Sequence, residues 1–182
     1  MKNSDLKGLP AINIADGAKI GDVERAYFDP VKKHVAGFAI AVEGGFLHPE
    51  RAVIADTIEI HSLGSGALTL DSAEPQGVDT SQRYGELIDL DEIVGRDVYT
   101  EGGVHVGHVS AAEFDERTFT LAEIEVAAGA LRHQRAISVG QITTIGSDVV
   151  VVSSAVLDPP PPEVIPRAES SNQEETEAQP AG

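Results

Sequence analysis

The sequence contains 182 residues, of which 30 are acidic and 13 are Lys or Arg, giving a formal net charge of −17 at pH 7. This charge repels phosphate backbones and anionic membranes, so we expect no direct nucleic-acid binding and favour basic proteins or cations as electrostatic partners. The absence of cysteine excludes disulfides, thiolate chemistry and cysteine-ligated zinc, and it fits a reducing compartment. Residues 1–8 lack the apolar stretch of a signal peptide, and no later run could span a bilayer, which predicts a soluble, cytoplasmic protein without membrane insertion.

The first elements in the chain have the short apolar periods of β-strands. Gly21 lies inside strand-like sequence just before Val23, where a glycine usually marks a bend or a bulge. Phe28 and Asp29 come before a proline whose fixed φ suits a tight turn, which predicts a hairpin leading into an alternating strand over residues 35–42. A small sheet needs such bends and hairpins to close on itself.

Shorter elements follow. A Gly-Gly pair at residues 44–45 offers the positive φ values of a tight connection, and a short strand begins at Arg51. Residues 55–60 are long enough for a single helical turn, whose Ile58 we expect to close one mouth of a small barrel. Residues 68–70 then supply the last strand of this half.

The same series of elements occurs a second time. The segment Ile-Gly-Asp-Val at residues 20–23 aligns with Val-Gly-His-Val at residues 106–109, at an offset of 86. Small differences in loop length carry the alignment to the end of both halves. The corresponding positions are Gly21, Val23, Phe28, Asp29, Arg51 and Ile58 in the first half and Gly107, Val109, Phe114, Asp115, Arg135 and Ile142 in the second. An internal repeat of this kind predicts two copies of one fold.

The second copy shows its strand pattern more clearly. Ile124 and Val126 alternate with Glu123 and Glu125, so one face of this strand enters a core and the other meets solvent. The four valines at residues 149–152 show no polar alternation, which predicts a strand covered on both faces.

These patterns divide the chain into four predicted segments. They are a first barrel domain at residues 1–72, a linker at 73–88, a second barrel domain at 89–157 and a tail at 158–182. The linker is polar and contains Pro and Gly. The proline-rich, acidic tail has too little apolar area to fold and should be disordered. It is either a solubilising extension or a ligand for a proline-binding groove.

We therefore predict an all-β protein of two tandem small barrels, closed or partly open, each with about five or six short strands and one short helical turn. Closure would remove the free strand edges that invite pairing with other chains. With 4% aromatic residues and no tryptophan, each barrel should enclose a separate interior built from Val, Ile, Leu and Ala.

The order of motifs in each copy resembles the PRC-barrel family: an Ile/Val-Gly-x-Val strand, an apolar-Asp turn, an alternating strand, a short Arg-Ala-Val/Ile strand, a helical turn and a closing aliphatic strand. The resemblance covers residues 6–157. It implies barrels that bind proteins, as in the cytoplasmic domain of the photosynthetic reaction-centre H subunit and the C-terminal domain of a ribosome-maturation factor. The chain lacks the transmembrane helix of the first and the N-terminal barrel of the second, so neither role transfers residue by residue.

Few side chains suggest chemistry. The candidates are His105, His108, His133, Glu101, Glu113, Asp115 and Glu123. His105 and His108 are three apart in a strand, which places them on opposite faces unless Gly107 introduces a bulge. Their first-copy counterparts, Lys19 and Asp22, form no ligand set. We therefore predict no metal site.

Other motifs also have ordinary structural explanations. Ser110, Ser138 and Ser147 lack a nucleophile-elbow sequence. The Gly-Ser-Gly turn at residues 64–66 lacks the lysine and the helix of a phosphate-binding loop. The acidic residues at 89–92 either cap the start of the second copy or form a solvated patch, with nothing to raise a pKa. We predict no catalytic residue and no cofactor, and hence no enzyme.

The sequence thus favours a non-enzymatic adaptor whose two barrels bind a protein partner, with homo-oligomers left open. The resemblance implies two alternatives, a ribosome-maturation-like factor that holds a basic ribosomal protein and an accessory protein of the reaction-centre H-subunit type. Arg51 and Arg135 either contact a partner or pack their stems beside a carboxylate.

Overall fold

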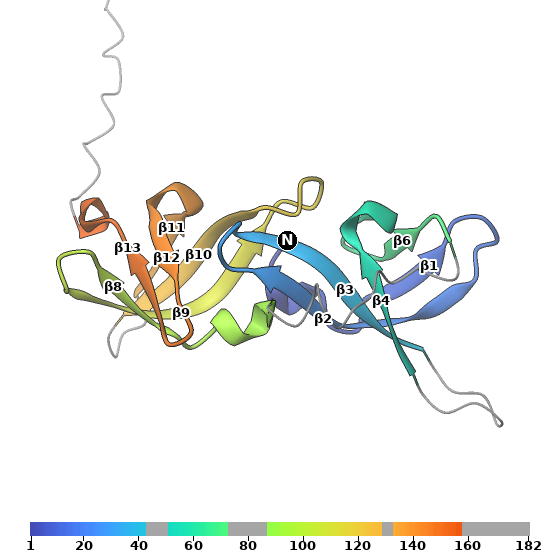
Figure 1. Cartoon of the computed structure of the whole chain (residues 1–182), viewed down its shortest axis with the longest axis horizontal. Coiled ribbons are helices and arrows are strands. Elements are labelled where there is room, and N and C mark those ends of the chain that lie inside the picture. Colours follow the sequence, from blue (N-terminus) through green and yellow to red (C-terminus); the bar gives the residue numbers. More distant parts are fainter. Residues whose placement is uncertain (43–50, 73–86, 129–132, 158–182) are drawn as a thin grey trace, which may run out of the picture.

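The computed structural model describes residues 1–42, 51–72, 87–128 and 133–157, and every structural statement below refers to them. Strands dominate this part of the chain, and its helical elements are short 3-10 turns. Figure 1 shows two sheets beside each other along the long axis, with the N-terminus between them. The predicted tail, the glycine pair at 44–45 and most of the predicted linker lie outside the described residues.

The first sheet has seven strands, six of which follow the order β4-β3-β2-β1-β6-β5. These six are β1 (Pro10–Asn13), β2 (Lys19–Asp29), β3 (His34–Val42), β4 (Arg51–Asp56), β5 (Ile60–Leu63) and β6 (Leu68–Leu70). The seventh, β7 (Ile88–Asp89), pairs with β2. The 3-10 turn η1 (Asn3–Asp5) precedes β1, and η2 (Thr57–Glu59) joins β4 to β5.

The second sheet has six strands in the order β11-β10-β9-β8-β13-β12. They are β8 (Asp97–Thr100), β9 (His105–Phe114), β10 (Leu121–Ala128), β11 (His133–Ser138), β12 (Ile142–Ile145) and β13 (Val149–Val152). The turns here are η3 (Leu90–Ile93), η4 (Val139–Gln141) and η5 (Ser154–Leu157). Because both sheets repeat one strand order, the prediction of two tandem all-β units is confirmed.

Each sheet curves into a partly open barrel. The pairs β1 with β6 and β8 with β13 are parallel, and the other neighbours in the two strand orders are antiparallel. The strands at the two ends of each order, β4 with β5 and β11 with β12, share no ladder. The barrels are therefore the open form of the predicted fold.

Gly21 and Gly107 lie at the predicted bends. The ladders of β1 with β2 and of β8 with β9 both shift register beside these glycines. A Cβ atom at Gly21 would lie 2.0 Å from the carbonyl oxygen of Ala41, and one at Gly107 would lie 2.3 Å from that of Ala127. Only a residue without a side chain allows the two backbones to approach so closely.

The predicted hairpin turns are confirmed, and an aspartate stabilises each one. Asp29 Oδ1 accepts hydrogen bonds from the backbone N–H groups of Val31 and Lys32 at 3.0 and 2.9 Å. Asp115 Oδ1 accepts two such bonds in the second turn, at 3.0 and 2.7 Å. Burial alone would raise the pKa of Asp29, but its hydrogen bonds outweigh burial and lower the pKa. Hydrogen bonds from Thr118 lower the pKa of Asp115.

Two of the predicted correspondences between the copies are wrong in register. Arg135 holds the place in the β10–β11 ladder that Val53, not Arg51, holds in the β3–β4 ladder. Ile58 lies in η2 and is 79% exposed, so it closes no barrel mouth, whereas Ile142 begins β12 and is buried. The cause is the β3–β4 connection, which has eight residues against four in the β10–β11 connection. The ladder, not local similarity, sets which residues correspond.

The expectation of two separate interiors is also wrong. Buried hydrophobic side chains from both sheets form one connected cluster. Phe38 of the first unit and Phe119 of the second meet edge to face, with ring centroids 6.0 Å apart. The interior is continuous because side chains from each unit pack against the other across their boundary.

The burial of the strands agrees with the predicted pattern in β10 and differs from it in β13. β10 confirms the expected alternation, because Ile124 and Val126 are buried and the glutamates beside them are partly exposed. β13 differs from its prediction, since Val150 and Val152 are buried but the other two valines are partly exposed. This strand is covered on one face only.

Candidate functional site at the seam between the units

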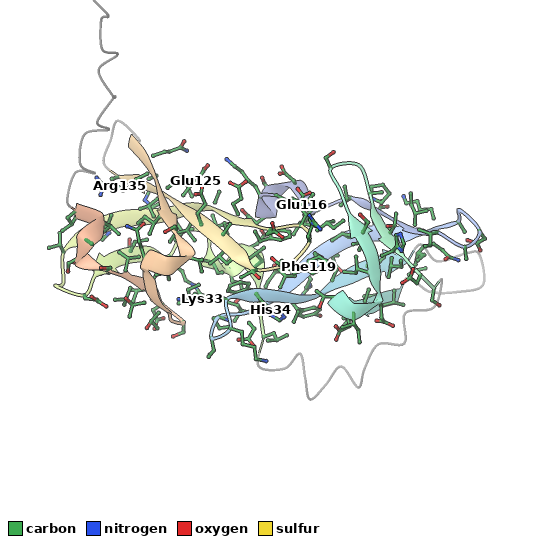
Figure 2. All side chains as sticks on the ribbon, turned by 90° about the horizontal axis from the view of Figure 1, so that it is seen from above. Lys33, His34, Glu116, Phe119, Glu125 and Arg135 are labelled. Atoms are coloured by element: carbon green, nitrogen blue, oxygen red, sulfur yellow. The ribbon has the colours of Figure 1, made fainter. Side chains whose placement is uncertain are left out.

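The starts of β3 and β10, two strands from different units, meet near the middle of the molecule, where Figure 2 labels Lys33, His34 and Phe119. The N–H of Val35 donates to the carbonyl oxygen of Phe119 over 2.8 Å, and that of Leu121 donates to the carbonyl oxygen of Lys33 over 2.9 Å. The middle residues of the two triplets form an antiparallel bridge. We call this contact the seam; it comprises Lys33, His34, Val35, Phe119, Thr120 and Leu121.

The first residue of each triplet has an unusual backbone. Lys33 and Phe119 have φ values of 55° and 57°, and no other non-glycine residue in the described ranges has a positive φ. This left-handed conformation is unfavourable for residues with a Cβ and persists only where the surroundings enforce it. The two side chains differ in what they contact: Lys33 Nζ donates to the carbonyl oxygen of Ile142, and the Phe119 ring packs on Phe38.

The residues that precede each unit attach to the other unit. These two lead-in segments are residues 1–5 and residues 88–93. The first joins β9, because Met1 and Phe114 exchange two backbone hydrogen bonds of 2.9 and 3.0 Å. The second joins β2 as strand β7, where Ile88 lies opposite Phe28. Each unit therefore holds the start of the other.

The side-chain amide of Asn3 anchors the first lead-in segment through both its nitrogen and its oxygen. Its Nδ2 donates to Asp91 Oδ1 over 2.7 Å, and its Oδ1 accepts the backbone N–H of Ala112 over 3.0 Å. The residue is 8% exposed, so these bonds satisfy polar groups that water cannot reach freely. One side chain thus links η1, η3 and β9.

Charges reinforce this attachment. Lys2 Nζ lies 2.6 Å from Glu125 Oε1, and a hydrogen bond to this carboxylate raises the pKa of Lys2. The α-ammonium group of Met1 lies 3.8 Å from Glu113 and 3.6 Å from Glu116. Glu123 lies opposite Glu113 in the ladder and has no ion-pair partner among the described residues. The outer face of β9 and β10 therefore keeps uncompensated negative charge.

Asp89 caps the second lead-in segment, as one of the two sequence interpretations proposed. Its Oδ1 accepts the backbone N–H of Asp91 over 3.0 Å at the start of η3. Burial raises the pKa of Asp89, which corrects the expectation that nothing there would shift a pKa.

Asp89→Asn should stabilise the protein at neutral pH, because asparagine keeps the cap and removes a partly buried charge. A carboxyl with a raised folded-state pKa stabilises fully below its unfolded pKa, near 3.8, and loses that contribution as pH rises through the folded value. The advantage of the variant should therefore appear above pH 4 and vanish at pH 3. Urea unfolding at both pH values measures it; a variant less stable at pH 7 would contradict the argument.

The predicted chemical candidates are not gathered into one site. His105 Nε2 lies 3.2 Å from Asp97 Oδ1 and its ring centroid 5.0 Å from that of Tyr99, on an exposed surface. His108 is also exposed, and the side chain of His133 lies outside the description. In the described ranges, no three His, Asp or Glu side chains are placed to share a metal ion.

The remaining candidates make local contacts. The three candidate serines, Ser110, Ser138 and Ser147, donate to the Glu125 carbonyl oxygen, Gln141 Oε1 and Asp148 Oδ2 respectively. The Gly-Ser-Gly turn closes the β5–β6 hairpin through a 3.0 Å bond from Gly64 N to the carbonyl oxygen of Ala67. Glu101 accepts a 2.8 Å hydrogen bond from Thr143 Oγ1. Arg135 donates to the carbonyl oxygen of Val156, a contact that neither sequence interpretation of this residue included.

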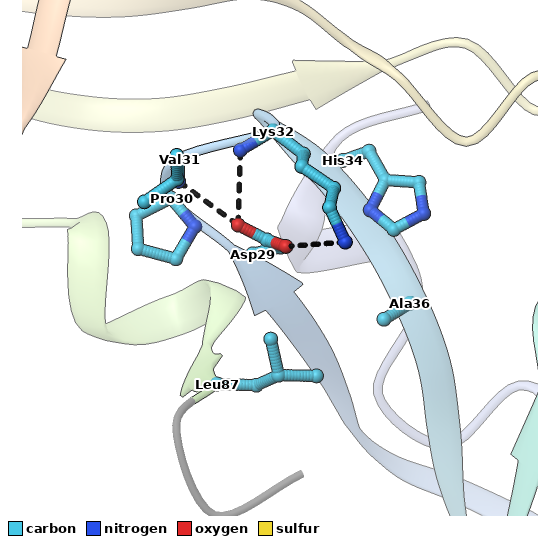
Figure 3. Close-up of a pocket in the computed structure, with 7 residues that line it drawn as sticks. All are labelled: Asp29, Pro30, Val31, Lys32, His34, Ala36 and Leu87. Carbon is cyan, nitrogen blue, oxygen red and sulfur yellow. Dashed lines mark hydrogen bonds and ion pairs between the residues drawn. The ribbon is translucent and has the colours of Figure 1, made fainter. Parts of the chain in front are cut away.

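Two pockets include residues of the seam. Figure 3 shows the first, a cavity of about 360 Å³ lined by the first hairpin turn, Ala36 and Leu87. Lys32 Nζ lies 3.4 Å from Asp29 Oδ2 on its wall, and His34 Nδ1 is buried without a hydrogen-bond partner among the described residues. The second, of about 300 Å³, lies between β5 and the turn that contains Phe119. Neither pocket includes the candidate serines, His105 or His108.

Comparison with known families agrees with the strand order. The family model for the PRC-barrel domain matches residues 1–76 and residues 85–157. The chain therefore belongs to the PRC-barrel family and contains two tandem copies of its domain. Membership suggests a general protein-interaction module and identifies no particular partner. A search of curated proteins found no match. The described part of the chain has no helix with the length and apolar character needed to cross a membrane.

Proposed function

We propose that this protein is a non-enzymatic adaptor in which two PRC-barrel units, joined at the seam, bind a protein partner as one body. The observation that carries the proposal is the pair of lead-in segments, each held by the opposite unit. Two units joined only by a flexible linker would present independent surfaces. Two units with a shared interior present their surfaces in a fixed relation, which lowers the entropy lost when both engage one assembly.

The absence of a role in catalysis is part of the proposal. Nucleophilic catalysis needs a hydroxyl bonded to a base that a third group orients. The candidate serines donate instead to a carbonyl, an amide and an adjacent carboxylate. The described His–Asp contacts, His61 with Asp71 and His105 with Asp97, are solvent-exposed, where water screens the interaction.

The net charge of the second unit indicates which charge to expect on the partner. Residues 89–157 contain eleven acidic and four basic residues, a net charge of −7, whereas residues 1–72 contain ten and seven, a net charge of −3. A basic protein would be attracted most strongly to the second unit. This asymmetry also supports the narrower alternative of a factor that holds a basic ribosomal protein. We place this binding in the cytoplasm, which suits a chain without cysteine.

Crosslinking and mass spectrometry of the tagged full chain in native lysate test the adaptor proposal. We expect one protein in stoichiometric amount, crosslinked to both units and lost as salt rises. Glu123→Lys should reduce its recovery, because this carboxylate has no ion-pair partner on the acidic face. Glu24→Lys, an exposed glutamate of the first unit, is the matched control and should not. Failure to recover a stoichiometric protein would refute the adaptor, and equal effects of the two variants would refute the acidic docking face.

A further inference from the structure

The seam has the symmetry of a dimer interface. Val35 lies opposite Phe28 in its ladder and Leu121 lies opposite Phe114 in its own, so Val35 and Leu121 correspond. His34 and Thr120 therefore also correspond, and they pair with each other in an antiparallel bridge. The two flanking hydrogen bonds also correspond. Val35 donates to Phe119 in one of them, and their counterparts Leu121 and Lys33 form the other. Contacts in which residue i meets j and j meets i define an isologous, two-fold interface.

The lead-in segments obey the same symmetry. Gly8 and Gly95 both donate their N–H over 2.8 Å to the corresponding residues of β2 and β9, which makes Met1 the counterpart of Ile88. Met1 joins Phe114, and Ile88 joins Phe28. A second, independent set of contacts is thus reciprocal about the same axis.

We propose that the seam is a pairing surface by which one PRC-barrel unit recognises another, and that its first unit can pair through the seam with the second unit of another copy of this chain. The contacts that form the seam join residues 33–35 directly to residues 119–121. We therefore expect these two surfaces to pair without the covalent connection. Within one chain the connection favours the intramolecular pair by raising its effective concentration.

Some side chains differ between the two copies, and these favour pairing of a first unit with a second unit over pairing of two identical units. Lys2 meets Glu125 across the boundary. In a pair of two second units, the counterpart of Lys2, Asp89, would face this glutamate and repel it. In a pair of two first units, the counterpart of Glu125 is Ala39, which offers Lys2 no charge. The structure thus contains an attractive pair and a repulsive alternative, the two elements of a specific interface.

A cleavable full chain tests the proposal. A protease site placed within residues 77–84, which lie outside both family matches, is cut after folding. We expect the two pieces to co-elute at the mass of the intact chain. Two cut samples that carry different labels are then mixed, denatured and refolded together. First-unit pieces with one label should pair with second-unit pieces with the other label in proportion to the abundance of each. Pieces that separate or aggregate singly after cutting would overturn the proposal.

Matched charge variants distinguish recognition at the seam from unspecific adhesion. In the cut chain, Lys2→Glu places two carboxylates together at Glu125 and should weaken re-pairing roughly tenfold in Kd. Lys19→Glu removes an exposed lysine that pairs with Asp22 inside the first unit, and it should leave re-pairing unchanged. Equal Kd values for the two variants would contradict a specific seam. Neither outcome depends on finding the outside partner of the adaptor.

Discussion

Gly107→Ala should destabilise the protein by about 3–5 kcal/mol, which would leave little of the stability typical of a small protein. The new Cβ would lie 2.3 Å from the carbonyl oxygen of Ala127, and both atoms belong to strands held in ladders on either side. Gly107 also has a φ of 150°, a conformation that residues with a Cβ rarely adopt. Relieving this steric clash would require β9 and β10 to move apart.

Urea unfolding of the full chain measures this effect. Gly140→Ala is the matched control in the same unit, because a Cβ there meets no atom within 4 Å. The control should unfold within about 0.5 kcal/mol of the parent protein. Because the interior is continuous, Gly107→Ala should also lower the stability of the first unit. If the Gly107→Ala protein were as stable as the control, the close approach of β9 and β10 at Gly107 would be wrong.

Asn3→Asp should cost about 3 kcal/mol at neutral pH, the second large effect. The new carboxylate could still accept the N–H of Ala112, but its other oxygen would replace an amide donor that lies 2.7 Å from Asp91. A buried carboxylate would then lie beside that of Asp91, and both burial and this neighbouring charge raise the pKa of the introduced group. The variant should therefore regain stability as pH falls through that raised pKa and its proton is donated to Asp91.

Asn13→Asp provides the comparison, measured by urea unfolding at pH 7 and pH 4. Asn13 is 4% exposed and accepts the backbone N–H of Ala15, and no carboxylate bonds to its side chain among the described residues. It should lose less stability than Asn3→Asp and respond less to pH. If the two variants behave alike, the contact between Asn3 and Asp91 contributes nothing particular to the attachment of the lead-in segment.

Local chemistry explains why much of the fold could be predicted. Gly21 and Gly107 indicated bends, Asp29 and Asp115 indicated turns, and their recurrence at one offset indicated two copies of one unit. Each of these signals is local, since a residue's own conformational limits determine where it is tolerated. The alignment of Arg51 with Arg135 failed because a longer β3–β4 connection moved the register.

The seam could not be predicted in the same way. It joins residues that lie 84 to 88 positions apart, and Lys33 and Phe119 share no side-chain property that marks a common left-handed backbone. Asn3 looks like an ordinary residue of a chain terminus, although it is buried between two units. The same contacts explain why separate interiors were the wrong expectation. The internal repeat was the available signal, because two copies of one surface can pair about a two-fold axis.

Amide hydrogen exchange at the seam measures whether the two units form one body. The N–H groups of Val35 and Leu121 donate across the seam, whereas those of Val23 and Val109 donate within a unit. We expect the first pair to exchange nearly as slowly as the second, because both open only with the shared interior. Exchange of Val35 and Leu121 at the rate of an unprotected chain, with Val23 and Val109 still protected, would contradict it.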